Sequence, residues 1–558
     1  MRDSIYAYVL LYTIFALLPI LSIFLLLVIA KQPARIAMPI VYGITLICAG
    51  VVWQVSPPVL AATSLRGLVI SLEILYILFG AMLLLNVLRQ AGALTTIRNS
   101  LLSISADRRV QAVIVAWLFG SFMEGAAGFG TPAVICVPLL AAIGFPPLAA
   151  VMVALVIQST PSTFGAVGTP LVVGIQNGLA NSEVVTRYLQ NAGLSMEQFL
   201  NAVTVKAAFI HALLGLFIPL ILVLILTLTF SKESDWRAAL SEWKFLLFSG
   251  AAFVVPYLIT AFLAGPEFPT LVGGMVGLLL VIVALGQGWF TIQRPWQFPD
   301  ASEWPESWIS ESYQGETSTS KSFPAWLAWL PYGLVAILLL LSRLQVLPFK
   351  EWLLGVGLHW ENVLGTQVDI SSTPLYLPPT IFIVVVIISI FLFRLPKAGC
   401  QKALVKAGQQ LLLAVIPLTG AVAMAQVFIG TGTNQLDLPS MPVYLADQAS
   451  AIFTQSWSWF ASTIGLIGAF ISGSVTLSNL MFSLFQFGVA EQTELPADLI
   501  VALQTVGASA GNMICVSNVV AAAATVAMMG REGLLIRRLL LPTAYYAIGA
   551  SLIGYFLL

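Results

Sequence analysis

The chain has 558 residues, of which 59% are hydrophobic and only 9% are charged, with 24 basic and 24 acidic side chains. Soluble domains carry about 25% charged residues, so this much apolar surface must face a lipid bilayer. The balanced charge argues against nucleic acid and strongly charged surfaces as partners.

Apolar runs long enough to cross a membrane recur along the whole chain. A spanning helix needs about 20 mostly apolar residues, and the first such run begins near the N-terminus. It exceeds the core of a signal peptide and no cleavage site of small residues follows, so we expect it to remain as the first span. The candidate spans lie near 5–30, 36–54, 65–88, 109–120, 148–173, 201–230, 244–264, 268–290, 324–342, 375–394, 406–429, 449–471, 497–529 and 539–557.

These runs predict an all-α polytopic membrane protein of about 12–14 transmembrane helices. The spans at 148–173 and 497–529 contain polar and Gly-rich interruptions. Two further stretches, 121–145 and 472–492, are too broken to span once and are predicted to be re-entrant hairpins.

Two aqueous stretches divide the apolar sequence. Residues 291–323 hold acidic side chains with Pro and Ser between them, which predicts a solvated, flexible linker between a membrane half at 1–290 and another at 324–558. The second stretch, 349–372, carries Trp and His and is predicted to lie on the membrane interface as an amphipathic segment.

An internal repeat relates the two halves. At an offset of 348 positions, GSFMEG at 120–125 falls on GAFISG at 468–473, and VAL at 153–155 falls on VAL at 501–503. The matched blocks follow the same order of helix, broken segment and broken helix. They predict one repeat over about 65–230 and the other over about 406–558.

Charge placement predicts that the repeats are inverted. The loop at 89–109 carries arginines, whereas the corresponding loop at 430–448 has no Lys or Arg. By the positive-inside rule the first loop is cytoplasmic and the second lies outside. Inverted repeats with interrupted helices are typical of secondary transporters, which bind substrate at mid-membrane between the repeats.

Four polar stretches interrupt the spans, and the first is GSFMEGAAGFGTP at 120–132. In a membrane, non-helical backbone survives only inside protein or beside a watery cavity, and backbone N–H groups at a helix start bind anions. Glu124 is an ionisable residue at this depth, which indicates function; the alternative is a loop residue satisfied by water near one interface. The substrate-binding candidates are Gly125, Gly128, Gly130 and Thr131.

The second stretch is QSTPSTFGAVGTP at 158–170. Pro161 removes a helical N–H group, and small hydroxyl side chains can both repair that break and bind a small polar solute. The alternative is close helix packing through small residues, which is common in membranes. The substrate-binding candidates here are Ser159, Thr160, Ser162, Thr163 and Gly165.

The third and fourth stretches, SGSVTLSN at 472–479 and TVGASAGNMICVSN at 505–518, take the same places in the second repeat. Unpaired polar groups cost several kcal/mol in hydrocarbon, so these side chains cannot face lipid. We predict that all four stretches converge on one site at the repeat interface. The candidates are Ser472, Gly473, Ser474, Thr476, Ser478, Asn479, Ser509, Asn512, Ser517 and Asn518.

The four stretches contain no Lys or Arg. A carboxylate substrate would therefore rely on backbone N–H groups, helix N-termini and hydroxyl or amide donors. An ionised Glu124 would repel such an anion. Glu124 is therefore predicted to couple transport to protons, ionised in one state and neutral when substrate is bound.

Two other polar residues in apolar runs leave alternatives open. His211 either joins a proton relay or is satisfied by a nearby carbonyl. Glu73 is either functional, or its charge reaches the membrane interface near the end of a span or pairs with Arg66. The chain has no GxxxxGK[ST] or HExxH motif and only 2 histidines, and we predict no enzyme, no cofactor and no metal site.

The four stretches resemble motifs of the L-lactate permease family. GSFMEGAAGFGTP is similar to that family's GAFLEGAAGFGxP, and STPSTFGAVGTP at 159–170 resembles its TAPVAFGAxGxP. SGSVTLSN and GASAGNMICVSN at 507–518 resemble its SGSDTSSN and GGVxGKMISPQS blocks. The resemblance covers most of the chain and implies an ion-transporter-like fold with inverted repeats and paired hairpins. It also implies import of lactate, and in some members glycolate, with protons across a bacterial-type inner membrane.

Two positions depart from the family pattern. Val475 stands where the family has Asp, and Asn512 stands where it has Lys. The two charged groups are predicted to pair in the relatives, because removing only one would strand a buried charge. If that pair serves coupling or substrate charge, the substrate or coupling ion of this chain differs.

The sequence thus predicts a carrier of a small monocarboxylate, L-lactate or glycolate, across the plasma membrane with a proton. The expected partners are a small organic anion, the coupling proton (or sodium) and the lipid bilayer, and a homodimer stays open. One alternative is a carrier for a different organic anion, coupled to sodium. The other is a membrane-embedded enzyme with Glu124 as general acid, which would need a second acid, base or metal nearby.

Overall fold

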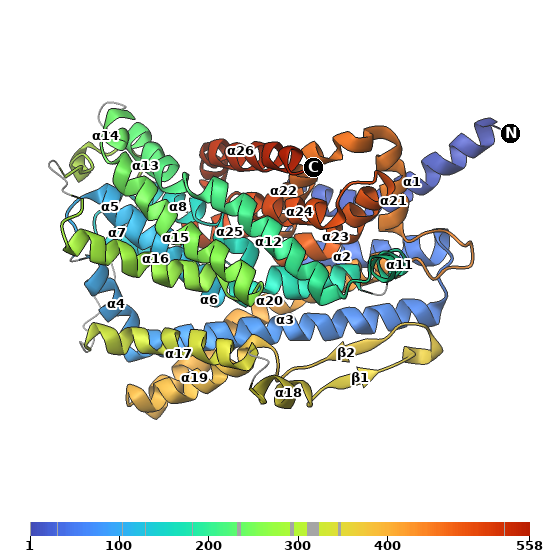
Figure 1. Cartoon of the computed structure of the whole chain (residues 1–558), viewed down its shortest axis with the longest axis horizontal. Coiled ribbons are helices and arrows are strands. Elements are labelled where there is room, and N and C mark those ends of the chain that lie inside the picture. The colour runs from blue at the N-terminus through green and yellow to red at the C-terminus, as the bar shows by residue number, and fades with distance from the viewer. Residues whose placement is uncertain are drawn as a thin grey trace.

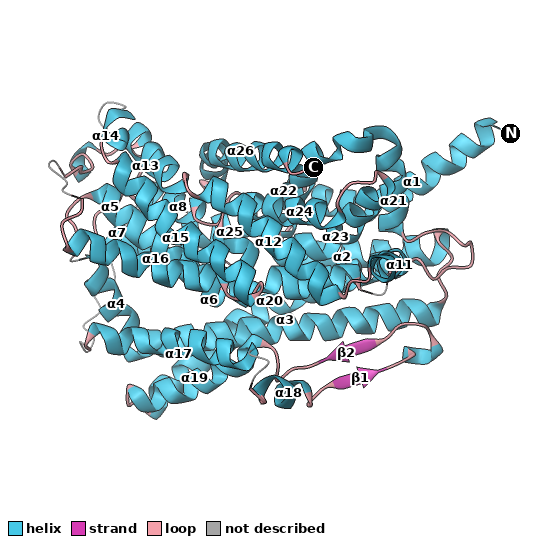
Figure 2. Ribbon diagram, viewed as in Figure 1, coloured by secondary structure: helices cyan, strands magenta, loops and turns pink. Residues whose placement is uncertain are grey.

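The computed structural model describes residues 2–30, 32–102, 104–128, 130–180, 182–231, 236–290, 295–309, 323–343, 347–528 and 530–558. Helices make up most of these residues and form an elongated bundle, with most of the long helices along its long axis (Figures 1 and 2). In the described residues, the one sheet is a short antiparallel ribbon.

The first half contains α-helices, π-helical segments (η1, η2, η3, η5) and a 3-10 turn (η4). They are α1 (Arg2–Phe24), η1 (Leu25–Ile29), α2 (Ala34–Ile47), η2 (Cys48–Val52), α3 (Pro57–Ala91), α4 (Ala93–Leu102), α5 (Arg108–Ala112), η3 (Val113–Gly120), α6 (Ser121–Ala127), α7 (Thr131–Ala142), α8 (Pro147–Val156), η4 (Pro161–Phe164), α9 (Gly165–Thr169), η5 (Pro170–Ile175), α10 (Gln176–Leu179), α11 (Glu183–Ala192), α12 (Met196–Gly215), α13 (Ile218–Thr229), α14 (Trp236–Leu240), α15 (Trp243–Ala264) and α16 (Pro269–Gly286).

The linker and the second half add the ribbon and three 3-10 turns (η6, η7, η8). Their elements are η6 (Ala301–Glu303), α17 (Ala325–Arg343), α18 (Phe349–Leu354), β1 (Leu358–Trp360), η7 (Val363–Gly365), β2 (Ile370–Ser372), α19 (Pro378–Leu392), α20 (Lys397–Gly430), α21 (Met441–Phe453), η8 (Thr454–Trp457), α22 (Ser458–Ser472), α23 (Val475–Gln492), α24 (Ala497–Asn512), α25 (Val516–Ala524) and α26 (Glu532–Phe556).

The structure confirms a polytopic helical membrane protein but has fewer candidate spans than predicted. In the described residues, ten helices are long and apolar enough to cross a membrane, and the bent pair of α8 with Pro161–Leu179 makes an eleventh. The predicted spans at 324–342 and 375–394 contain only the shorter apolar helices Ala325–Leu339 and Pro378–Leu392. The span predicted at 449–471 is divided between α21, η8 and the 15-residue α22. At about 1.5 Å per residue, such helices are shorter than the roughly 30 Å hydrocarbon layer.

The first hairpin has two antiparallel arms, but it begins before the predicted bounds of 121–145, because most of its first arm lies in the span predicted at 109–120. α5, η3 and α6 form one arm that ends at Gly128, and α7 returns beside it, so the Cys136 thiol lies 3.4 Å from the Val115 carbonyl oxygen. The two ends of the hairpin are adjacent, because a Cβ at Gly144 would lie 3.2 Å from an Arg108 guanidinium nitrogen. At the tip, Gly128 has a φ of +58°, a conformation that favours glycine.

The second predicted hairpin is shifted along the chain. Residues 472–492 do not contain both arms, because α23 is one unbroken helix and the other arm is the preceding helix α22. The turn lies at Gly473, with a φ of +76°. The polar residues of α23 do not break it, because they bond to neighbouring helices: the Ser478 hydroxyl donates to the Gly465 carbonyl of α22 at 3.0 Å.

Both predicted broken helices are interrupted. α8 and the segment that begins with η4 meet at a bend of 62°. Within α9, Ala166 and Val167 have φ angles of 44° and 55°, a left-handed run that no regular helix contains. In the second broken helix, α24 ends at Asn512 and α25 begins at Val516.

The first long helices of the two predicted repeats, α3 and α20, run antiparallel. A Cβ at Gly67 would lie 2.6 Å from the Ala423 Cα, and the Asn86 amide donates to the Gln410 amide oxygen at 2.9 Å. Residue numbers therefore rise along α3 as they fall along α20. Inverted repeats require this orientation.

The two hairpins have their bases at opposite ends of the bundle. The base of the first lies with α5 and α7 at the left of Figure 1. The second hairpin approaches its base beside α11 at the right, where the Phe487 and Tyr188 rings lie 5.2 Å apart. The two hairpins therefore approach the centre of the molecule from opposite directions.

The described part of the linker, 295–309, is mostly exposed or half-buried, and it is anchored to the helices at several points. The Trp296 backbone N–H donates to the Asp107 carboxylate at 2.9 Å, and the Leu148 backbone N–H donates to the Trp308 carbonyl at 3.2 Å. This segment therefore crosses the base of the first hairpin and the start of α8. Residues 291–294 and 310–322 of the predicted linker lie outside the described residues.

The aqueous stretch at 349–372 forms α18 and the ribbon of β1 and β2, which was not predicted. The ribbon lies along α3 (Figure 2), and its buried Ile370 shares an apolar cluster with Ala62. The Ser372 hydroxyl donates to the Glu73 carboxylate at 2.6 Å. Glu73 is thus satisfied by the ribbon.

Candidate functional site

All four interrupted stretches contribute to one cavity at the centre of the bundle. Its walls come from α6, from the segment η4–η5, from the tip of the second hairpin and from the end of α24. The lining residues are Glu124, Gly128, Ser162, Gly165, Ala166, Pro170, Gly473, Ser474, Val475, Thr476 and Asn512.

The cavity is narrow in this conformation. Its volume is about 20 Å³, which is enough for a water molecule. A small organic acid is several times larger. The walls must therefore move apart before the cavity can take a substrate of that size.

Glu124 lies one turn before the tip of the first hairpin and is only 3% exposed. A Cβ at Gly165 would lie 2.6 Å from its Oε1 atom, so the carboxyl group rests directly on this glycine. Within the described residues its Oε2 atom has no hydrogen-bond partner within 3.5 Å, and the Gln158 side chain interacts with the carboxyl group. Glu124 is also the only ionisable side chain among the described residues that line the cavity. Because a buried unpaired carboxylate is costly, this geometry favours a carboxyl group that is neutralised by a proton or by a ligand.

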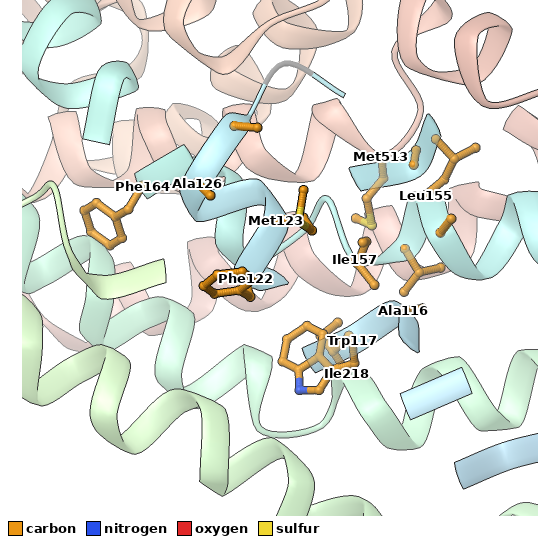
Figure 3. Packing of buried hydrophobic residues seen from close by; sticks show 14 of the residues in the cluster. Ala116, Trp117, Phe122, Met123, Ala126, Leu155, Ile157, Phe164, Ile218 and Met513 are labelled. Atoms are coloured by element: carbon orange, nitrogen blue, oxygen red, sulfur yellow. The ribbon is translucent and has the colours of Figure 1, made fainter. Parts of the chain in front are cut away.

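Apolar packing holds the arm that carries Glu124. Phe122, Met123 and Ala126 of α6 belong to the same buried cluster as Phe164 and Met513 from the two broken helices (Figure 3). On α6 itself, Gly125 lets α16 approach, because a Cβ there would lie 2.5 Å from the Leu271 backbone nitrogen. Gly125 is thus a packing residue in this conformation.

Amide side chains connect the two broken helices. The Asn512 amide donates to the Gln158 amide oxygen at 2.8 Å, and the Asn518 amide donates to the Asn512 amide oxygen at 3.0 Å. A Cβ at Gly130 would lie 2.5 Å from the Asn518 oxygen, so the tip of the first hairpin rests on these amides. Gln158 was not predicted as a site residue, although a buried amide at the start of the second stretch could have indicated it.

Hydroxyl groups of the two predicted repeats also meet. The hydroxyl oxygens of Thr163 and Ser509 lie 2.7 Å apart, and that of Ser162 lies 3.3 Å from Ser509. Thr163 and Ser509 are 346 positions apart, so this contact joins the broken helices of the two halves of the chain.

The tip of the second hairpin is held by the break between α24 and α25. The Ser517 hydroxyl donates to the Gly473 carbonyl at 3.4 Å. Val475 belongs to a small buried cluster with Ala469 and Ala508. Val475 and Asn512, the two departures from the family pattern, thus line the same cavity.

Several predicted residues surround the cavity without lining it. Asn479, for example, donates to the Thr505 hydroxyl at 2.8 Å and to the Pro170 carbonyl at 3.0 Å, and the Ser472 hydroxyl donates to the Ser474 carbonyl at 3.1 Å. The members of this group are Gly125, Gly130, Thr131, Ser159, Thr160, Thr163, Ser472, Ser478, Asn479, Ser509, Ser517 and Asn518.

The prediction missed three lining residues, Ala166, Pro170 and Val475. They lie in or beside the predicted stretches, but their side chains are apolar and carry no polar signal.

Ser509 lies in a GxSxG pattern at 507–511. In hydrolases the serine of this pattern sits on a sharp turn between a strand and a helix. Here it lies inside the continuous helix α24, and its hydroxyl is bonded to Thr163. The pattern therefore does not form a nucleophile elbow.

The sequence model of the L-lactate permease family matches residues 12–558. The chain belongs to this family. Membership in a permease family makes it a transporter and not an enzyme. Together with the ten or eleven candidate spans, it makes the chain a multi-pass protein of the plasma membrane.

Curated relatives are similar over most of their length. A putative L-lactate permease of Haemophilus influenzae is 30% identical over 86% of this chain and 86% of its own. The L-lactate permease of Bacillus subtilis is 27% identical over 94% of this chain and 91% of its own. The glycolate permease GlcA of Escherichia coli is 25% identical over 97% of this chain and 94% of its own.

Among solved structures, the chain is similar to the YdaH transporter of Alcanivorax borkumensis. The two are 14% identical in sequence, and the match covers 86% of this chain and 84% of the other with a TM-score of 0.38.

Proposed function

We propose that this permease imports a small monocarboxylate, L-lactate or glycolate, together with a proton that binds Glu124. The names of the relatives support this substrate class. The observation that carries the proposal is the buried Glu124 carboxyl, which has an oxygen without a partner and is the only ionisable group among the described residues lining the cavity.

Electrostatics supports a proton as the coupling ion. Two carboxylates at about 4 Å repel each other by roughly 4 kcal/mol at an effective dielectric constant of about 20. Protonation of Glu124 removes this repulsion and adds an O–H donor for the substrate. The empty cavity with ionised Glu124 carries one negative charge. The cavity with protonated Glu124 and one bound monocarboxylate also carries one negative charge. One proton therefore accompanies each anion.

The substrate carboxylate and hydroxyl groups are bound in this proposal by donors around the cavity. α23 begins at Val475 beside the cavity, so its N-terminal N–H groups attract an anion. The side chains of Ser162, Ser474, Thr476 and Asn512 add hydroxyl and amide groups that can bind the substrate. The other predicted site residues hold these groups in place.

The proposal also places one repeat in each half of the chain, and the two repeats have inverted orientations. The first, at about 65–230, lies in the half at 1–290, and the second, at about 406–558, lies in the half at 324–558. The antiparallel contacts of α3 with α20 support this assignment, as do the opposite directions of the two hairpins, which are re-entrant in this proposal. Movement of the hairpin tips would widen the cavity for substrate. A homodimer stays a prediction.

Uptake into proteoliposomes tests the proposal. Purified protein is reconstituted, and uptake of labelled L-lactate and glycolate is measured with an inward proton gradient, with an inward sodium gradient and with neither. We expect the proton gradient to accelerate uptake of both acids, with mutual competition. Stimulation by sodium alone, or no uptake by folded protein, would overturn it and point to another coupling ion or anion.

A further inference from the structure

His211 of α12 is fully buried, and both of its ring nitrogens face hydroxyl groups. Nε2 lies 2.7 Å from the Thr163 hydroxyl oxygen, and Nδ1 lies 2.6 Å from the Tyr546 hydroxyl oxygen. Thr163 belongs to the broken helix of the first half, and Tyr546 belongs to α26. One imidazole therefore bridges two elements that are far apart in the sequence.

The contacts extend from this imidazole to three other elements, the broken segment, α24 and α26. Thr163 also meets Ser509 of α24 at 2.7 Å, and Tyr546 meets the Thr160 hydroxyl at 2.9 Å. α12 lies close to the break, because a Cβ at Gly215, one turn after His211, would lie 2.9 Å from Thr160. The face of α12 that carries His211 thus supports the broken segment directly.

A neutral imidazole fits this arrangement of hydroxyl groups. The Thr505 carbonyl lies 3.2 Å from the Thr163 hydroxyl oxygen and can only accept. When Thr163 donates to this carbonyl, it accepts from His211 Nε2–H, and His211 Nδ1 accepts from the Tyr546 hydroxyl. A neutral His211 satisfies every group in this arrangement without an added proton. This differs from the proton relay and from the carbonyl contact considered from the sequence.

The broken segment needs such side-chain support. Between α8 and α9 the helical hydrogen bonds are interrupted, and Pro161 has no N–H group. Ser162, the next residue, lines the cavity. The hydrogen bond from His211 to Thr163, which we call the tether, therefore also fixes the position of the Ser162 hydroxyl.

We propose that His211 is a positioning residue for substrate binding: a neutral imidazole that holds the broken segment at Ser162 and Thr163 in its binding geometry. This inference rests on the proposed function, because it takes the cavity lined by Ser162 as the substrate site. A loss of the tether misplaces a binding group and leaves proton coupling at Glu124 intact.

The test compares His211→Leu with His211→Gln in proteoliposomes, with wild type and His359→Leu in parallel. His359 is exposed on β1 and is the other histidine of the chain, so it is the matched control. We expect His211→Leu to raise the KM for uptake about tenfold, the effect of losing a buried hydrogen bond, with a smaller change in maximal rate. His211→Gln keeps an N–H donor for Thr163 and should restore most of the affinity and the proton-driven accumulation.

Two results would overturn the inference. An unchanged KM for His211→Leu per folded molecule would make His211 a stability residue only, and loss of proton-driven accumulation in His211→Gln with exchange preserved would make it a proton carrier. If His211→Leu does not fold, Tyr546→Phe and Thr163→Val replace it, because each removes one hydroxyl from the imidazole, and an unchanged KM in both contradicts the tether. Failure of the proposed function is recognised separately, because the wild type itself would then take up neither acid; the variants are in that case compared with the anion that it does carry.

Discussion

Gly165 lets the Glu124 carboxyl group reach the cavity. A Cβ at this position would lie 2.6 Å from Oε1, and the backbone angles, φ −66° and ψ 158°, are open to alanine. Gly165→Ala should therefore act only through the carboxyl, and such overpacking costs about 1–3 kcal/mol. We expect the initial rate of proton-driven uptake to fall about tenfold. Gly408→Ala in α20, where a Cβ meets nothing within 4 Å, is the control, and equal rates for both variants would refute the contact.

Val475 stands in the cavity wall where the family has an aspartate, so Glu124 has no second carboxylate beside it. Val475→Asp would place an unpaired acid in the same buried wall, and a buried charge without a partner is costly. We expect this variant to lose most uptake, measured as initial rate per folded protein. Adding Asn512→Lys on the same cavity should restore part of it, because the new charges can pair.

The neutral variant Val475→Asn separates charge from shape in this experiment. It should retain more uptake than Val475→Asp. If both variants are equally impaired, packing against Ala469 and Ala508 matters and charge does not.

Single residues were predictable where a polar group stands in an apolar run. Glu124, Ser162 and Thr476 follow from this signal, and each lines the cavity. Contacts such as Asn512 with Gln158 join residues 354 positions apart. Sequence spacing within one stretch contains no information about such pairs.

At the scale of elements, the linker segment 295–309 depends on a buried ion pair at the base of the first hairpin. Asp107 is 1% exposed, pairs with Arg109 at 2.6 Å and accepts the Trp296 N–H. Asp107→Ala would leave the Arg109 guanidinium buried and less paired, which costs about 3–5 kcal/mol. We expect a clearly lower Tm in detergent, read by intrinsic fluorescence.

Asp300→Ala is the matched control for this prediction, because Asp300 is exposed in the same segment. It should unfold like the wild type. An equal Tm for all three proteins would mean that the segment does not stabilise the hairpin base.

Broken helices were predictable because Gly, Pro and hydroxyl residues cluster in them. The second hairpin was misplaced because hydroxyls and amides that bond to other helices look, in the sequence, like helix breakers. Ser478 is such a case. The ribbon of β1 and β2 has strands of only three residues each, too short for an alternating pattern to indicate them.

At the scale of the whole molecule, inverted repeats predict that the hairpin bases face opposite sides of the membrane. Ala142 and Glu494 are exposed at the two bases. In a background without the native cysteines, Ala142→Cys should react with an impermeant maleimide only from the cytoplasmic side, where the arginines of 89–109 lie. Glu494→Cys should react only from outside.

Labelling of both cysteines from the same side would contradict the inverted arrangement. The repeat was predicted only from short matched blocks at an offset of 348. Their orientation came from charge in the loops. The sequence could not predict that α3 packs against α20. A small residue such as Gly67 allows close packing, but it does not indicate which apolar helix is the partner.

The central claim is that Glu124 carries the proton that accompanies each substrate anion. The most direct test is Glu124→Gln in proteoliposomes, with proton-driven accumulation and substrate exchange measured on the same preparation. The amide is similar in shape to the protonated carboxyl but cannot release a proton. The account predicts that accumulation is abolished while exchange of labelled for unlabelled L-lactate continues. Proton-driven accumulation at the wild-type level in Glu124→Gln would contradict it.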